Sequence, residues 1–178
     1  SAAKLFKALQ ERTWAEVPAR VIEGNTLEVS PQQIGQQVGL VITSPPYPNA
    51  YEYWLYHKYR MWWLGLDPIA VKAQEIGARA HFFKKVPHTA EMFRDQMMAT
   101  FTLIDKVLVK DGFVCVVVGR SKIHGKTIDN GATIQDVGLT LGFDVVSKFE
   151  RAMNQNRKSF NLSHANIKSE TVLVFRKN

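Results

Sequence analysis

A small polar residue followed by two prolines and a tyrosine, Ser44-Pro45-Pro46-Tyr47, is the part of this chain best suited to chemistry. Each proline favours an extended backbone and lacks an N–H donor, so the carbonyls of the segment stay free to accept hydrogen bonds. The Ser44 hydroxyl adds another acceptor, and the Tyr47 ring offers a flat face for stacking. Acceptors beside a flat ring suit a planar base that carries an amino group.

Two apolar runs must hold this motif in place. The run Val38–Ile42 directly precedes Thr43 and Ser44 and predicts a strand buried on both faces. That strand would present the motif at its carboxyl end, where open α/β sheets bind their ligands. The second run, Phe113–Val118, is β-branched and continuous and predicts another buried strand. Between them, a long helix capped by Thr89 is expected from apolar residues at spacings of three and four, namely Phe93, Met97, Phe101, Ile104 and Leu108.

The remaining pattern alternates strands with helices, which indicates an α/β fold. With 178 residues and no linker or repeat, we expect a single domain over residues 1–178. Ser30 and Pro31 predict the start of a short helix. Other helices are expected at 3–12, 51–66, 69–80 and 133–141, and other strands at 19–25, 143–150 and 171–176. The last two strands should pair antiparallel, because the loop 151–169 between them has no helical period.

Composition favours an intracellular protein with an anionic partner. The formal net charge is +7 and the isoelectric point about 9.6, which favours nucleic acid over a merely soluble basic surface. No run approaches the length of a membrane span and no signal peptide is evident, so we expect a cytoplasmic protein without membrane contact. The single cysteine, Cys115, is expected in the core, and neither the cysteine nor the histidine spacing suggests a metal site.

The motif resembles the catalytic signature of S-adenosylmethionine-dependent amino-methyltransferases of DNA. That signature is Asp, Asn or Ser followed by Pro-Pro and an aromatic residue, at the end of the fourth strand. Thr43–Tyr47 is similar to the Thr-Ser-Pro-Pro-Tyr form found in bacterial and archaeal DNA methylases, including those of restriction–modification. The resemblance implies a partial Rossmann-like sheet of strands 4, 5, 7 and 6, with a terminal antiparallel pair and helices on both faces.

The resemblance also implies roles for individual residues. The amine of a flipped-out base would donate to the Ser44 side chain and the Pro45 carbonyl, and the Tyr47 ring would stack on the base. Pro46, with Pro45, would keep the backbone of this catalytic motif extended. S-adenosylmethionine would be the methyl donor, contacted at Asn25, Thr43 and Ser44. The serine form favours cytosine N4 over adenine N6 as the target. Transfer RNA stays open as a substrate, although enzymes of that group usually carry Asp at the Ser44 position.

One departure from the family decides how much of an enzyme this chain encodes. The Gly-rich loop that cradles the cofactor and the acidic residue for its ribose are both absent, and Gly24-Asn25 stands where the family has Gly-Asp. The chain therefore resembles the C-terminal, catalytic-motif portion of an incomplete or split methyltransferase. An upstream segment or a companion chain would carry the Gly-rich loop, and the isolated chain is expected to be inactive. The alternative is a non-catalytic module that binds nucleic acid or a partner.

DNA contacts are expected from polar, aromatic and basic residues around the motif. Segment 67–90 is the one insertion large enough to face the target. Core positions are predicted for Leu55, Trp54 and Trp62, whereas tyrosines nearer the motif suit the base pocket. The expected substrate-binding residues are Asn49, Tyr51, Tyr53, Arg120, Lys122, Lys126, Arg157 and Lys158. A turn-forming role for Asn49 and a merely solvated loop around His124 are the competing interpretations.

Overall fold

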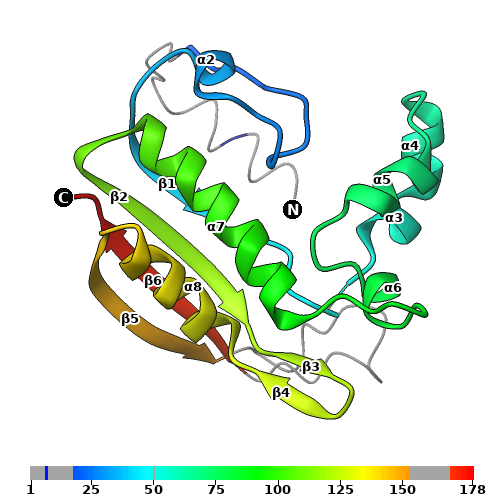
Figure 1. The fold of residues 1–178 in the computed structure, drawn as a ribbon. Coiled ribbons are helices and arrows are strands. Elements are labelled where there is room, and N and C mark those ends of the chain that lie inside the picture. The colour runs from blue at the N-terminus through cyan, green and yellow to red at the C-terminus, as the bar shows by residue number, and fades with distance from the viewer. Residues whose placement is uncertain (1–6, 8–17, 50, 153–168) are drawn as a thin grey trace.

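The computed structural model describes residues 7, 18–49, 51–152 and 169–178 and contains a mixed four-stranded sheet (Figure 1). The strands β1 (Val38–Thr43), β2 (Leu108–Gly119), β5 (Asp144–Ala152) and β6 (Ser169–Arg176) lie in the order β1-β2-β6-β5. β1 and β2 are parallel, and β6 runs antiparallel to both of its neighbours. This order is the predicted 4-5-7-6 arrangement, so the α/β fold class and the terminal antiparallel pair are confirmed.

Two helices, α7 (Ala90–Val107) and α8 (Asn130–Thr140), cover one face of the sheet (Figure 1). The Thr89 hydroxyl accepts a hydrogen bond from the Met92 N–H and caps α7, as predicted. Alternate residues of β2 point into this layer and are fully buried, because side chains change face at every residue of a strand. The core consists of Phe93, Met97, Phe101, Ile104, Leu108, Val114, Val116, Val118, Ile134, Val137, Phe143, Leu173 and Phe175.

The opposite face of the sheet carries apolar side chains that no described helix covers. Leu40 pairs with Phe113, and Ile42 with Cys115, so these four residues share that face. The exposed fractions of Leu40 and Ile42 are 54% and 72%, and Cys115 is only partly buried. Among the described residues, the expectation of a strand β1 buried on both faces is therefore wrong.

Short elements connect β1 to α7 and β2 to α8. The first connection contains α3 (Tyr53–Tyr56), α4 (Lys58–Trp63), α5 (Pro68–Gln74) and α6 (Arg79–Phe82), where two longer helices were predicted. The second contains the hairpin β3 (Ser121–Ile123) and β4 (Lys126–Ile128), where a plain loop was predicted. Figure 1 shows α6 and this hairpin at the same end of the sheet, beyond the carboxyl ends of β1 and β2.

The N-terminal part of the described chain differs most from the prediction. Residues 18–29 contain a turn after Asn25 and no strand, and the Val21 side chain is 93% exposed. No described strand lies beside this segment to pair with it, so its backbone has no ladder to join.

The capped helix α2 (Pro31–Ile34) is present, with Ser30 and Gln33 bonded reciprocally. The predicted helix 3–12, apart from the helical Lys7, and most of the loop 151–169 lie outside the described residues. No helix of the described chain is long and apolar enough to cross a membrane.

Candidate functional site

The motif lies where predicted, directly after the last residue of β1. Thr43 pairs with Val116 in the ladder, and the chain then leaves the sheet through Ser44, which is exposed. Pro45, Pro46 and Tyr47 are half-buried. An exposed hydroxyl followed by proline-fixed backbone gives a short row of hydrogen-bond acceptors at the carboxyl end of a parallel strand.

Tyr47 joins this row to the core. Its side chain packs against the hydrophobic core, which holds the ring from one side. Burial, then the nearby Glu170 carboxylate and Tyr53, raise the pKa of Tyr47 to about 12. The phenol is therefore neutral at any physiological pH. Glu170 is itself mostly buried and forms an ion pair with Arg151.

Gly77 supports the motif from a distant part of the sequence. Its φ is +72°, and a Cβ at this position would lie 3.0 Å from the carbonyl carbon and oxygen of Tyr47. The Gly77 carbonyl also accepts the Asn49 N–H at 3.0 Å. The Asn49 side chain donates to the Lys122 carbonyl of the β3–β4 hairpin, while Asn49 itself has a φ of +58°. The motif is thus fixed between the segment after α5 and the hairpin.

Two glutamates connect helix α3 to the segment around Gly77. Oxygens of Glu75 accept the N–H groups of Tyr53 and Trp54 at 2.8 and 2.9 Å, and Glu52 accepts the Ala80 N–H at 3.1 Å. The first bonds satisfy donors that a helix N-terminus leaves free, with a carboxylate that complements its dipole. Sequence reasoning missed Glu52, Glu75 and Gly77, because their partners lie more than twenty residues away and leave no local pattern.

The aromatic residues after the motif form stacked pairs near the surface. Tyr51 stacks on Tyr56 with ring centroids 4.3 Å apart, and Tyr53 lies 4.6 Å from Tyr51. The prediction of core positions is wrong for Leu55 and Trp62, since Trp62 is 58% exposed and Leu55 is also exposed. Two short helices replace the expected long one, so no single apolar stripe faces the core.

Asn130 is a buried polar residue that sequence reasoning did not select. It is fully buried at the start of α8, and its amide donates to the Gly119 carbonyl and the Ser121 hydroxyl at 2.8 and 2.7 Å. Its Oδ1 has no partner among the described residues. These bonds fix the turn that follows β2, next to the strand that carries the motif.

Three of the other predicted contacts lie together at the β3–β4 hairpin. Arg120, Lys122 and Lys126 are exposed beside or on the hairpin, and Arg157 and Lys158 lie outside the described residues. Asn25 uses its side chain within its own turn, accepting the Leu27 N–H and donating to Glu28.

The described residues do not form a cradle for S-adenosylmethionine. The Asn25 side chain is already engaged in its own turn, and the sequence lacks the Gly-rich loop. The described part of the chain also brings together no group of three His, Cys, Asp or Glu residues able to hold a metal ion.

The chain is similar to three solved structures of one protein of Thermus thermophilus, which is assigned as a DNA modification methylase. The TM-scores are 0.45, 0.49 and 0.46 at identities of 21%, 19% and 20%, and the third structure is a complex with S-adenosyl-L-methionine. These matches cover 79%, 86% and 79% of this chain but only 45%, 52% and 48% of the other. The chain thus spans about half the length of these structures. No protein-family profile and no curated protein matches it.

Proposed function

We propose that the protein is an S-adenosylmethionine-dependent DNA amino-methyltransferase, or the part of one that grips the target base, with cytosine N4 favoured over adenine N6. The observation that carries the proposal is the position of Thr43–Tyr47 at the carboxyl end of β1, in a sheet ordered β1-β2-β6-β5 with β6 antiparallel. The basic composition favours DNA as the partner. A cytoplasmic location goes with this function.

The chain's own residues act on the amine. An exocyclic amino nitrogen is a poor nucleophile because its lone pair is delocalised into the ring. The Ser44 hydroxyl and the Pro45 carbonyl accept its two hydrogens and favour a tetrahedral nitrogen. The base must leave the duplex to reach them, and stacking on the Tyr47 ring offsets part of that cost. A neutral Tyr47 suits this role, since a phenolate would repel the phosphates on either side of the base.

S-adenosylmethionine supplies the methyl group in this proposal and must be held mainly by other residues. The carriers proposed are an upstream segment or a companion chain with the Gly-rich loop. In the part of the chain that the structure describes, the apolar face around Leu40 and Ile42 has no helix on it and β1 is an edge strand, and both features support this because they would bind a further helix and strand. Thr43 and Ser44 would contribute one wall of the shared site.

Mass spectrometry of digested nucleosides tests the proposal. Unmethylated DNA is incubated with methyl-deuterated S-adenosylmethionine and the protein, alone and with a polypeptide from the same organism that carries the Gly-rich loop. Deuterated N4-methylcytosine is expected in the second mixture, and Ser44→Ala should reduce it by at least tenfold. If deuterated N6-methyladenine formed instead, the proposed target base would be wrong but the proposed amino-methyltransferase activity would stand.

A non-catalytic nucleic-acid-binding module is the second candidate, favoured by the missing Gly-rich loop. DNA binding without any methylated base, in both mixtures, would support it and overturn the enzyme.

A further inference from the structure

The loop between α6 and α7 is closed on itself and forms an open pocket at the surface. The His88 N–H donates to the His81 carbonyl at 2.9 Å, and the two imidazole rings stack with centroids 4.5 Å apart. This double contact brings the ends of residues 82–87 together. The pocket has a volume of about 330 Å³ and is lined by Lys84, Lys85, Val86, Pro87, His88 and Met92.

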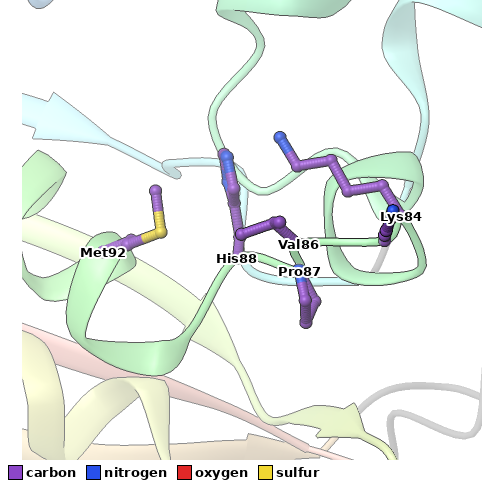
Figure 2. Close-up of a pocket in the computed structure, with 6 residues that line it drawn as sticks. Lys84, Val86, Pro87, His88 and Met92 are labelled. Carbon is purple, nitrogen blue, oxygen red and sulfur yellow. The ribbon is translucent and has the colours of Figure 1, made fainter.

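The pocket combines an apolar wall with cationic groups. Val86, Pro87 and Met92 form the wall, and Figure 2 shows the side chains of His88 and Met92 on the same side of the ribbon. Lys84 and Lys85 line the pocket and are exposed, and no carboxylate of the described chain forms an ion pair with either lysine. Residues 79–88 include three Lys or Arg and no Asp or Glu, so this segment itself carries a net positive charge.

Contacts connect this loop to the β3–β4 hairpin and to Gly77, which hold the motif Thr43–Tyr47 in place. His124 of the β3–β4 hairpin bonds the Phe82 carbonyl at 3.0 Å, and its ring lies 5.2 Å from that of Phe83. The same hairpin receives the Asn49 side chain, and α6 follows Gly77, which touches the Tyr47 backbone. A ligand that spans the pocket and the motif would therefore contact one connected framework.

We propose that the pocket of Lys84, Lys85 and His88 binds the sugar-phosphate backbone of the DNA beside the target base. The ammonium groups face the phosphodiester, and the deoxyribose packs on Val86 and Pro87. An ammonium is a compact charge that binds phosphate without fixed geometry, which suits backbone contact rather than sequence reading. Burial, together with His81 and Lys84, lowers the pKa of His88, so the imidazole is a neutral hydrogen-bonding group there. This inference rests on the proposed function, since it takes DNA as the ligand.

Fluorescence anisotropy with a labelled duplex oligonucleotide tests the site without cofactor. Affinity is measured over a range of salt for the wild type, for Lys84→Ala/Lys85→Ala, and for the control Lys106→Ala/Lys110→Ala. The control removes the same charge from two exposed lysines beyond the other end of α7 from the pocket, Lys106 in its last turn and Lys110 in β2, and α7 is about 27 Å long at 1.5 Å per residue. The slope of log affinity against log salt should fall by about one to two units in the pocket variant, because each phosphate contact contributes about 0.9.

Affinity at 0.1 M salt should drop by at least about eightfold in the pocket variant, since one contact of that slope is worth this factor. The control should change less than twofold. Equal changes in both variants would overturn the proposal. The proposal would also be overturned if the pocket variant bound a free deoxynucleoside monophosphate more weakly than the wild type but bound the oligonucleotide equally well. Weaker DNA binding in the pocket variant, with no methylated base formed by the wild type, would keep this site while the proposed enzyme fails.

Discussion

Gly77→Ala tests whether a segment outside the motif sets the motif's geometry. An alanine at a φ of +72° costs roughly 1–2 kcal/mol of backbone strain. Its Cβ would also lie 3.0 Å from the Tyr47 carbonyl carbon and oxygen, whereas carbon atoms pack best at about 3.5–4.0 Å. The motif backbone must therefore move by about 0.5–1 Å, and such overpacking adds about 1–3 kcal/mol.

Gly65→Ala provides a matched control, because Gly65 has a φ of +73° and a Cβ there would meet no atom within 4 Å. Both variants carry the same strain, so the difference in their free energies of unfolding isolates the contact with Tyr47. Urea unfolding should show Gly77→Ala less stable than Gly65→Ala by about 1–3 kcal/mol. Base methylation should fall about a hundredfold in the first variant, as expected for a misplacement near 1 Å, and stay unchanged in the second. Equal stability losses with full activity in both would refute the reasoning.

Two further predictions concern neighbours of the motif. Glu75→Gln removes one of the two carboxylate acceptors of the Tyr53 and Trp54 N–H groups, and urea unfolding should show a loss of about 1–2 kcal/mol that the exposed control Glu23→Gln does not show. The pKa of Tyr47 is raised from 10.0 to about 12 in the folded protein. The neutral phenol therefore contributes its full stabilisation of the fold below pH 10, and this contribution is lost as the pH rises towards 12. Stability should therefore fall more steeply above pH 10 in the wild type than in Tyr47→Phe, and the variant should lack the last tyrosinate absorbance step; parallel stability profiles would contradict the burial of this phenol.

Local patterns in the sequence predicted the elements that have local causes. The Thr89 cap, the spacing from Phe93 to Ile104, and the β-branched run of β2 each specify their element within a few residues. The strand β1 was predicted for the same reason, but its predicted burial on both faces was wrong. Burial depends on which elements cover a strand, and the apolar residues of β1 look alike whether a helix lies on them or not.

The geometry of the site could not be predicted because its causes are long-range. The five residues Thr43–Tyr47 indicate what chemistry is possible, yet their backbone is held by Gly77, and the following helix by Glu75, across more than twenty residues. A glycine in Glu75-Ile76-Gly77-Ala78 gives no local sign that it faces a carbonyl group. In the proposed function the acceptors at Ser44 and Pro45 must hold fixed positions, so residues that never touch a base would determine whether these acceptors can bind an amine. An intact motif is therefore insufficient for function, and a change at Gly77 should separate the two.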